Sequence, residues 1–381
     1  MGRSLKITFD YQIFSSQVQG GISRYFLELA RHLSRVEQVE ILAPAFVTTN
    51  LQQSYRDLLS PSFAAYDRLS SLVAGTGFKA REASWRRRVN QRVSRWYLGR
   101  AEPDVFHETF FEADPLPLTS ARRVLTVQDM IDELILLPDG RTSQAFVDVK
   151  RAAIERADHV LVSSKQSQID LLKLIPIAET KTTVVHLGCR ALGEWPAPAG
   201  LADDLPPYML FVGSRDTYKN FDGLLRALAM SPRLLKSLTL VAFGGGPFTA
   251  GERGVAAQLG IPGTRMVQRD GDDRVLADLY RRARLCVYPS FYEGFGLIPL
   301  EAMTLGCPVV TTHGGSLAEV VVNAGEVVDP ASVESISAGL ERVAFDEARR
   351  TELATAGIAH AATFTWQRCA DETLAVYRSL A

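Results

Sequence analysis

The apolar positions of the chain form short runs that alternate between extended and helical spacing. Residues 5–10 form the first run, Gly20 and Gly21 interrupt the pattern, and residues 22–33 repeat apolar side chains at the spacing of a helix. This order is the strand, loop and helix of a βα unit. Strands that alternate with helices predict a parallel sheet covered on both faces, with ligands at the carboxyl ends of the strands. Further strands are expected at 39–42, 105–107, 124–127, 159–163 and 181–187.

The alternation begins again at residue 208, after a stretch rich in glycine, proline and alanine at 188–207. A chain of 381 residues exceeds the size at which one hydrophobic core usually stops growing. We therefore expect an α/β protein of two Rossmann-like domains, residues 1–188 and 189–365, which face each other across a cleft. The amphipathic stretch 366–381 predicts a last helix that packs back on the first domain. In the second domain, strands are expected at 208–212, 238–243, 265–268, 285–288 and 308–311, and helices near 221–229, 255–259, 275–283 and from 297.

Composition and charge narrow the class of protein. Lysine and arginine number 42 against 43 aspartate and glutamate residues, so the net charge of −1 gives no general attraction to nucleic acid. The four cysteines stand far apart without a CxxC pair, which predicts reduced structural thiols, no metal site and no cofactor. The sequence begins almost directly with an apolar strand and shows no secretory leader or membrane-length apolar run. These features predict a cytoplasmic protein, in the cytosol or on the inner face of a membrane.

The most informative segment is residues 288–310, YPSFYEGFGLIPLEAMTLGCPVV. An apolar strand ends near Pro289, and the Glu-Gly-Phe-Gly sequence from Glu293 to Gly296 predicts a tight loop whose backbone can approach a ligand. Pro299 suits the first turn of a helix, where its missing N–H is harmless. The unpaired N–H groups and the dipole of that helix start predict a diphosphate site.

Glu293 and Glu301 lie eight positions apart, one on this loop and the other about one turn inside the helix. An ionised carboxylate only accepts hydrogen bonds, so the paired hydroxyls of a sugar or a ribose suit each of them. An isolated pair of acids is more often a solvated loop acid and a surface helix acid. The flanking glycines, the proline and the helix start favour the binding site over that interpretation.

A second candidate loop follows the strand that ends at Val212. Ser214, Arg215 and Lys219 lie within it, and a helix is expected directly afterwards. Two cations at a strand end, beside the loop of Glu293, suit a diphosphate that leaves with growing negative charge. Ordinary surface cations are the other interpretation, and the residues alone leave both open.

These segments resemble the family-four retaining glycosyltransferases, and the resemblance extends from the Gly-Gly-Ile-Ser-Arg sequence at residues 20–24 to the last helix at Trp366. It implies the GT-B fold, with an acceptor domain followed by a nucleotide-sugar donor domain. It also implies that Glu293 meets the hydroxyls of the transferred sugar, that Glu301 binds the ribose, and that Arg215 and Lys219 stabilise the leaving diphosphate. The catalytic residues implied are Glu293, Arg215 and Lys219. The donor-binding residues implied are Gly21, Ser214, Arg215, Lys219, Glu293, Gly294, Phe295, Gly296, Leu297 and Glu301.

The same family has two cleft-lining loops in the amino-terminal half, which correspond here to the segments of His107 and of Gln128-Asp129. The chain departs from the family at Gln128, where relatives commonly carry a histidine. A glutamine cannot become a cation near neutral pH. Gln128 therefore either still hydrogen-bonds the donor sugar or has another role. Arg215 also stands one place later than the usual arginine of such loops.

Two glycine- or acid-rich motifs have simpler explanations. Asp270 and Asp272 form a DxD sequence that is typical of a metal site in another glycosyltransferase fold, but it precedes an expected helix at residue 275, where acids cap N–H groups. The Gly-Gly-Gly-Pro sequence at residues 244–247 lacks a third glycine at Thr249, so it fails the dinucleotide fingerprint and predicts a tight turn beside the cleft.

Residues 79–100 form a basic segment with a net charge of about +7 in a nearly neutral protein. Trp85, Val89, Val93, Trp96 and Tyr97 follow helical spacing within it. Such a helix can lie on an anionic membrane surface or meet a lipid-diphosphate acceptor. A solvated helix whose apolar stripe packs on its own domain fits the same pattern, and both interpretations stay open.

We therefore expect a metal-independent retaining hexosyltransferase that moves a sugar from a nucleotide-diphosphate donor to a saccharide or lipid-linked acceptor in polysaccharide or lipopolysaccharide assembly. The Gly-Ile-Ser-Arg-Tyr and Tyr-Lys-Asn loops resemble those of mannosyltransferases, which implies GDP-mannose as the donor. Two alternatives stay open: a nucleotide-sugar epimerase of the same fold, and a non-catalytic sugar-nucleotide-binding protein, an option that Gln128 keeps open.

Overall fold

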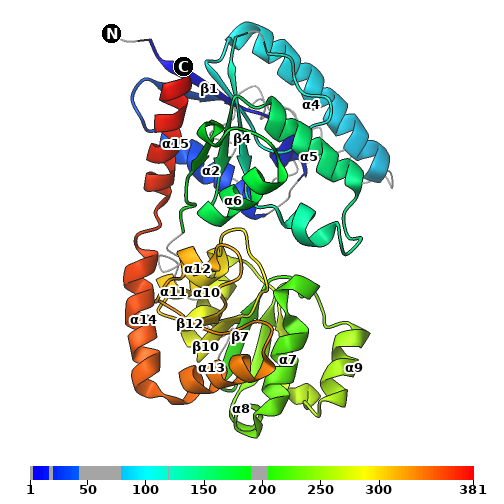
Figure 1. The fold of residues 1–381 in the computed structure, drawn as a ribbon, viewed down its shortest axis with the longest axis vertical. Coiled ribbons are helices and arrows are strands. Elements are labelled where there is room, and N and C mark those ends of the chain that lie inside the picture. The colour runs from blue at the N-terminus through cyan, green and yellow to red at the C-terminus, as the bar shows by residue number, and fades with distance from the viewer. Residues whose placement is uncertain (1–2, 17–19, 43–78, 119, 190–204) are drawn as a thin grey trace. The chain divides into compact units, whose positions relative to one another are not determined.

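The computed structural model describes residues 3–16, 20–42, 79–118, 120–189 and 205–381, with only the backbone of residues 79–86 (Figure 1). The chain divides into two compact units. The first comprises Met1–Ser163, Ser167–Leu187 and Trp366–Ala381, and the second comprises Ser164–Gln166 and Gly188–Thr365. Each is a Rossmann-like unit with one parallel six-stranded sheet, which confirms the α/β fold class predicted from the alternation of strands and helices. No helix in the described part of the chain is long and apolar enough to cross a bilayer.

The first unit has the strand order β2-β1-β3-β4-β5-β6. Its strands are β1 Leu5–Phe9, β2 Val39–Leu42, β3 Val105–Glu108, β4 Arg122–Val127, β5 His159–Val162 and β6 Thr182–Val184. Its helices are α1 Gln12–Ser16, α2 Gly21–Leu33, α4 Lys79–Ala101, α5 Gln144–Arg156, α6 Lys165–Leu174 and α15 Trp366–Leu380, with a short π-helix at Asp132–Leu136 and a 3-10 turn at Glu179–Lys181. Because β1 lies between β2 and β3, the order of strands reverses between β1 and β3.

The last helix, α15, belongs to the first unit because it packs on α2. The rings of Tyr25 and Trp366 are 6.2 Å apart between centroids, and Tyr377 is fully buried beside His107 of β3. The apolar face of α15 supplies Trp366, Leu374 and Tyr377 to the core of this unit. The chain therefore returns to its first unit after completing the second.

The second unit has the strand order β12-β11-β10-β7-β8-β9. Its strands are β7 Tyr208–Val212, β8 Thr239–Phe243, β9 Met266–Arg269, β10 Leu285–Tyr288, β11 Val309–Thr311 and β12 Glu326–Val327. Its helices are α7 Phe221–Met230, α8 Pro232–Ser237, α9 Ala250–Gln258, α10 Asp273–Arg282, α11 Leu297–Thr304, α12 Leu317–Val320, α13 Val333–Phe345 and α14 Glu347–Ala361, with 3-10 turns at Thr217–Lys219 and Gly263–Arg265. The order of strands reverses here between β7 and β10.

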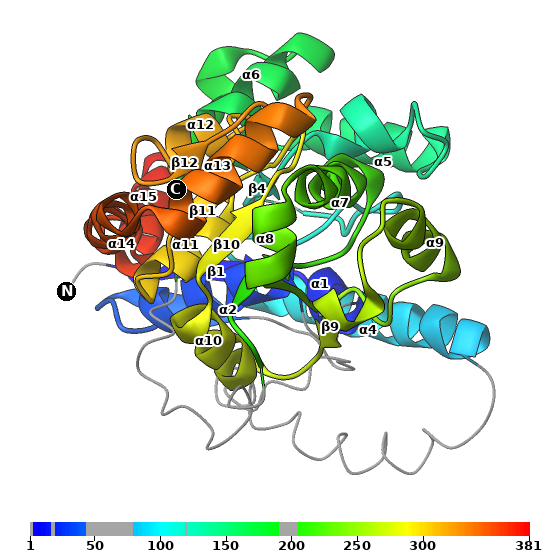
Figure 2. The same cartoon turned by 90° about the horizontal axis from the view of Figure 1, so that it is seen from below.

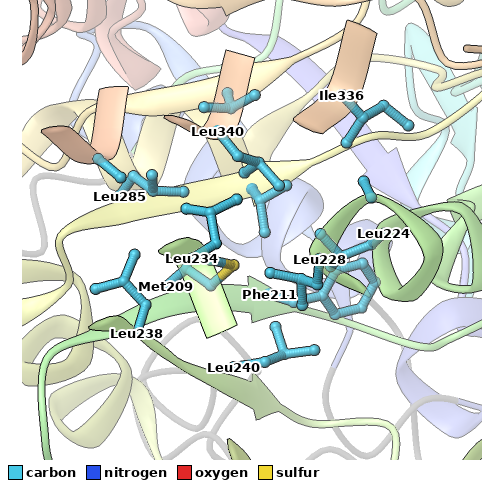
Figure 3. Packing of buried hydrophobic residues seen from close by; sticks show 14 of the residues in the cluster. Met209, Phe211, Leu224, Leu228, Leu234, Leu238, Leu240, Leu285, Ile336 and Leu340 are labelled. Carbon is cyan, nitrogen blue, oxygen red and sulfur yellow. The ribbon is translucent and has the colours of Figure 1, made fainter. Parts of the chain in front are cut away.

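The sheet of the second unit is covered on both faces, as its almost continuous apolar strands require. Met209 and Phe211 of β7 point into a cluster that α7, α8 and α13 close with Leu224, Leu234 and Leu340, all of them buried (Figure 3). Helices α10 and α11 lie on the opposite face (Figure 2). Every residue of β7 is buried, so this strand forms the rigid centre of the unit.

Side-chain caps fix the start of two helices more closely than apolar spacing does. Asp272 Oδ1 accepts hydrogen bonds from the N–H groups of Arg274 and Val275 at 3.0 and 3.2 Å, which confirms the capping interpretation of the DxD sequence. Helix α9 begins at Ala250, five residues earlier than expected, because Thr249 and Glu252 form a reciprocal capping box there.

Candidate functional site

The candidate donor site of the second unit lies where β7 and β10 end. These strands are neighbours in the sheet, but β7 is followed by β8 on one side and β10 is followed by β11 on the other. Such a switch point is the usual ligand site of an open parallel sheet. Loop 213–219 follows β7, loop 289–296 follows β10, and loop 312–316 follows β11. All three loops therefore meet at the carboxyl edge of one sheet.

A buried ion pair joins the first two loops. Lys219 Nζ lies 2.8 Å from Glu293 Oε1 and donates to the Tyr288 hydroxyl at 2.7 Å. The side chains of Lys219 and Glu293 are only 10% and 9% exposed. Burial, followed by the nearby Glu293 carboxylate, raises the pKa of Tyr288 well above its usual range, so the phenol stays neutral beside the pair. Lys219 and Glu293, predicted to lie at one edge of the sheet, are therefore in direct contact.

Asn220 holds the β7 loop against the β10 loop. Its backbone lies in the left-handed region, with φ of 57°, which asparagine tolerates better than most residues. Its side-chain Nδ2 donates to the carbonyl oxygens of Pro289 and Pro330 at 3.2 and 2.8 Å. The two loops that carry Lys219 and Glu293 thus keep a fixed spacing.

The backbone of Glu293 is held by loop 312–316. Its carbonyl accepts hydrogen bonds from both the N–H and the hydroxyl of Ser316, each at 2.9 Å. A Cβ atom on Gly315 would lie 2.3 Å from the Glu293 carbonyl oxygen, and one on Gly314 would lie 2.2 Å from that of Phe291. Only two glycines permit this close approach. Sequence reasoning missed this glycine pair, although it directly follows an expected strand.

Helix α11 begins at the same edge. Gly296 precedes it with φ of 110°, and no side chain in the described part of the chain caps its start. The N-terminal backbone groups and the dipole of such a helix favour an anion. Glu301 lies one turn inside, is 7% exposed and faces Tyr280, whose pKa is raised well above its usual range by burial and then by this carboxylate. Phe295 is buried against Phe364, with ring centroids 5.9 Å apart.

Arg215 does not join the Lys219–Glu293 pair, contrary to the expectation that both cations face a leaving diphosphate. Its side chain is 4% exposed, and its Nε donates to Glu252 Oε1 at 2.5 Å. The other guanidinium nitrogens donate to the carbonyl oxygens of residues 244–247 at 3.0 to 3.3 Å. Arg215 therefore fastens the glycine turn after β8. The neighbouring Ser214 is exposed and donates to Asp216 at 2.7 Å.

The glycines of this turn are required by the same contact. Gly244, Gly245 and Gly246 have φ values of 78°, 69° and 74°, and a Cβ on Gly245 would lie 2.9 Å from Arg215 Nη1. Three successive left-handed residues turn their carbonyl oxygens toward the guanidinium. This explains the glycine run without a dinucleotide.

His107 is part of the core of the first unit, so the expectation that it lines an open cleft is wrong. It is fully buried, its Nε2 lies 2.8 Å from the Thr126 hydroxyl, and its Nδ1 bonds to the Tyr377 hydroxyl. Burial lowers the pKa of His107 to about 3, so the ring is neutral at physiological pH. Strand β3 extends to Glu108, one residue further than expected, and His107 is in register with Phe9 of β1 and Val124 of β4 inside the sheet.

The other amino-terminal candidates lie at strand and helix ends. Gly21 begins α2, and the space where its Cβ would stand is open. The side-chain Nε2 of Gln128 is buried without a hydrogen-bond partner among the described residues. The backbone carbonyl of Gln128 accepts hydrogen bonds from the hydroxyls of Ser163 and Ser167. The carbonyl of Asp129 accepts from Lys150 Nζ at 3.0 Å. Gln128 thus offers an unsatisfied donor at the end of β4.

A hollow of about 510 Å³ lies at the switch point of the first sheet. Tyr11 and Gln12 follow β1, and Phe110 and Glu112 follow β3; Arg87 of α4 completes the wall and pairs with Glu112. Asp10, which directly precedes Tyr11, is fully buried, and burial raises its pKa to about 7. It accepts hydrogen bonds from the N–H and the Nε2 of Gln12 at 3.1 and 2.7 Å. This hollow has hydrogen-bonding groups and aromatic faces that suit a saccharide.

Sequence reasoning overlooked several buried polar groups of these edges. Asp10 directly follows an apolar strand, and that position was a usable signal. Lys150 is 1% exposed and donates to Asp132 and Glu133 at 3.2 and 2.9 Å. Its place on the middle of α5 gave no local signal, because the partners come from the π-helix at Asp132–Leu136.

Comparisons with known proteins concern the family and the fold. Residues 19–190 match the family model for glycosyltransferase family 4, and residues 197–360 match that for glycosyl transferases group 1. O-antigen chain mannosyltransferase B of Escherichia coli is 30% identical over 378 residues, which are 94% of this chain and 96% of that protein. Sucrose-phosphate synthase of Thermosynechococcus elongatus superposes with a TM-score of 0.72 at 20% identity, over 99% of both chains. Anabaena HepE in complex with UDP-glucose superposes at 0.67 and 18%, over 98% of this chain and all of that one. The solved structures confirm the GT-B fold.

Proposed function

The chain belongs to glycosyltransferase family 4, and on that premise we propose that it transfers a mannose-type hexose from a nucleotide-diphosphate donor to a saccharide, with retention of configuration. It is an enzyme of the glycosyltransferase class. The observation that carries the proposal is the buried Lys219–Glu293 pair at the switch point of the second sheet, beside the start of α11.

The donor is proposed to lie across the start of α11. The N–H groups at Phe295, Gly296 and Leu297 would receive the phosphates, because that helix start is a favourable place for negative charge. Glu301 would accept hydrogen bonds from the ribose diol, and Glu293 from the hydroxyls of the transferred sugar. Ser214 and Gly294 would line the remaining parts of the donor site in the second unit.

Lys219 is proposed to act on the leaving group. Its ammonium is already held by Glu293 and Tyr288, so it needs little reorganisation when charge develops on the departing diphosphate. The leaving phosphate would accept the proton of the attacking acceptor hydroxyl on the same face of the sugar, and the C–O bond to the acceptor would form as the bond to the phosphate breaks. Arg215 would support this step only indirectly, through the turn at residues 244–247.

The acceptor is proposed to bind the hollow at the switch point of the first sheet, with Arg87 and Glu112 in its wall. We also propose that this enzyme acts in polysaccharide or O-antigen assembly. The E. coli relative supports this, because its name gives both the O-antigen chain and mannose. That relative also supports GDP-mannose as the donor. The named relatives do not favour an epimerase or a non-catalytic binding protein, because they are glycosyltransferases.

We also propose that α4 touches an anionic membrane from the cytoplasmic side, where a lipid-linked acceptor would be found. Its inner face carries the buried residues Asn90, Ser94 and Leu98. Trp96 is 59% exposed, and the guanidinium of Arg100 lies 4.2 Å from its ring centroid. The exposed arginines on the described part of this helix are Arg87, Arg88, Arg92, Arg95 and Arg100. Trp85 of the expected stripe lies outside the residues whose side chains are described.

Transfer from labelled donors tests the proposal. The chain is incubated with GDP-mannose, UDP-glucose, dTDP-rhamnose and ADP-glucose, each with a panel of mannosyl saccharides. The expected result is a labelled α-linked product from GDP-mannose, lost in Lys219→Met and kept in Lys236→Met, a matched change at an exposed lysine of α8. Isomerised donor in the absence of acceptor would instead identify an epimerase, and unchanged transfer by Lys219→Met would refute the site.

A further inference from the structure

A second hollow lies in the second unit, at the edge of the sheet opposite the candidate donor site. It encloses about 530 Å³ where β7, β10 and β11 begin, whereas Lys219 and Glu293 follow the ends of β7 and β10. These parallel strands are five and four residues long, so the two places are separated by roughly 13–17 Å of strand. Among the residues that the structure describes, none lines both of them.

Three arginines from separate elements line this second hollow: Arg282 at the end of α10, Arg284 before β10 and Arg350 in the first turn of α14. Arg282 pairs with buried Asp278 at 3.0 Å. The other two guanidinium groups share one carboxylate, that of Glu347: Arg350 Nη2 contacts its Oε2, and Arg284 Nη2 lies 4.0 Å from the same atom. Two cations therefore converge on one anion position.

The carboxylate at that position is a weak partner. The Glu347 side chain is 76% exposed, whereas that of Arg350 is only 15% exposed. Arg350 Nη1 is buried and has no hydrogen-bond partner among the residues that the structure describes. A buried charged donor without an acceptor is costly, and an exposed carboxylate on a flexible side chain is easily displaced. The arrangement therefore suits a second, stronger anion.

Other contacts fix the arginines in place. Arg284 Nε donates to the carbonyl of Ala344 near the end of α13 at 2.8 Å, and the same side chain lines the hollow. Burial, and then the nearby Arg350, lower the pKa of Arg284, as expected where positive charge is incompletely balanced. The hydroxyls of Thr351 and Thr355 donate to backbone carbonyls of α14, so recognition falls to the guanidinium groups.

We propose that this hollow binds the phosphate group of a small soluble molecule, with Arg284 and Arg350 as its ligands and with Glu347 displaced. A phosphate dianion presents several acceptor oxygens to two planar guanidinium groups, a geometry that favours arginine over lysine. The volume exceeds that of a bare phosphate, and Ile358 and Pro308 supply an apolar wall for the rest of the molecule. The site is independent of the nucleotide-sugar site and of the proposed transfer.

The test is calorimetric titration of the full chain with inorganic phosphate at pH 7.5, with ionic strength held constant by sodium chloride. Wild type is expected to bind one phosphate saturably at this site. Arg350→Gln should weaken binding at least tenfold, and Glu347→Gln should strengthen it several-fold, because a competing carboxylate is removed. Arg226→Gln removes an exposed arginine that is paired with Asp222 on α7 and should change nothing.

Lys219→Gln separates this site from the donor site, because phosphate binding at the second hollow should survive it. Glu347 is exposed, so Glu347→Gln gives a readout even if Arg350→Gln fails to fold. The absence of saturable binding in wild type would overturn the proposal. So would an unchanged affinity in Glu347→Gln, or a loss of binding in Lys219→Gln in place of Arg350→Gln.

Discussion

A double-mutant cycle on Lys219 and Glu293 tests whether these side chains form one electrostatic unit. At 2.8 Å and an effective dielectric constant of about 20, their attraction is about 6 kcal/mol before desolvation is subtracted. Removal of one partner leaves the other charge nine-tenths buried, with Tyr288 as the remaining contact of Lys219. Such a loss typically costs about 3–5 kcal/mol.

We therefore expect Lys219→Met and Glu293→Gln each to lower the free energy of unfolding by about 3 kcal/mol or more. The double variant should lose about as much as either single one, because no unpaired charge remains, which gives a coupling energy of about 3 kcal/mol. Urea unfolding of the full chain, followed by circular dichroism, measures all four proteins. The exposed pair Arg226–Asp222 is the matched control, with an expected coupling of about 0.3–0.5 kcal/mol.

Additive losses at Lys219 and Glu293, within about 0.5 kcal/mol, would refute this reasoning and with it the ion pair. For a test of turnover, Glu293→Gln is preferable to Glu293→Ala, because alanine removes the volume and the hydrogen-bonding groups of the side chain as well as its charge. Glu293→Gln keeps the side-chain volume and an acceptor for Lys219, so its loss of transfer is interpretable once its melting temperature is known.

Three further predictions concern the frame of the two sites. Gly315→Ala places a Cβ 2.3 Å from the Glu293 carbonyl oxygen at φ of 64° and should cost about 2–4 kcal/mol in urea unfolding; a cost below about 0.5 kcal/mol would contradict the close approach. Arg215→Ala leaves Glu252 and the turn at residues 244–247 without their donor, so it should lower unfolding free energy by about 3 kcal/mol, and an unchanged midpoint would contradict the assigned contacts. Asp10 has a pKa of about 7 in the folded protein against an ordinary value of 3.8. Between these pH values the folded carboxyl keeps a proton that the unfolded one has released. The free energy of unfolding therefore falls as the pH rises from about 4 to about 7. Asp10→Asn should therefore gain unfolding free energy relative to wild type at pH 8 compared with pH 5, and an equal difference at both pH values would contradict the buried carboxyl.

The alternation of apolar runs was sufficient to predict both sheets except for the short edge strand β12, and it also predicted the edge at which loops 213–219 and 289–296 meet. Lys219 and Glu293 each follow a buried strand, and parallel strands bring such positions to one edge whatever the loops do between them. That is why their proximity could be inferred from spacing. Tyr288 is the last residue of β10 and therefore lies at the same edge of the sheet. An apolar strand, however, gives no indication that the hydroxyl of its last residue bonds to a cation.

The failures have a common physical cause, since they depend on contacts between distant segments. Arg215 follows the same strand as Lys219, but its direction is set by the inward carbonyls of residues 244–247, about 30 positions later. His107 was expected at the end of a strand, and the family resemblance implied that it lines a cleft, whereas the register of β3 with β1 and β4 carries it into the core. Local spacing cannot distinguish these outcomes, because the partner of each side chain lies in another element.

Lys219, Glu293 and the start of α11 are proposed to bind a nucleoside diphosphate. Thermal unfolding with GDP, UDP, dTDP and ADP measures this directly, because a ligand present at about 100 times its Kd stabilises the folded state by about 2.7 kcal/mol. We expect at least one nucleotide, GDP first, to raise the melting temperature of wild type and of Lys236→Met, but not of Lys219→Met at the same concentration. No shift with any of the four, or an equal shift in Lys219→Met, would contradict the site.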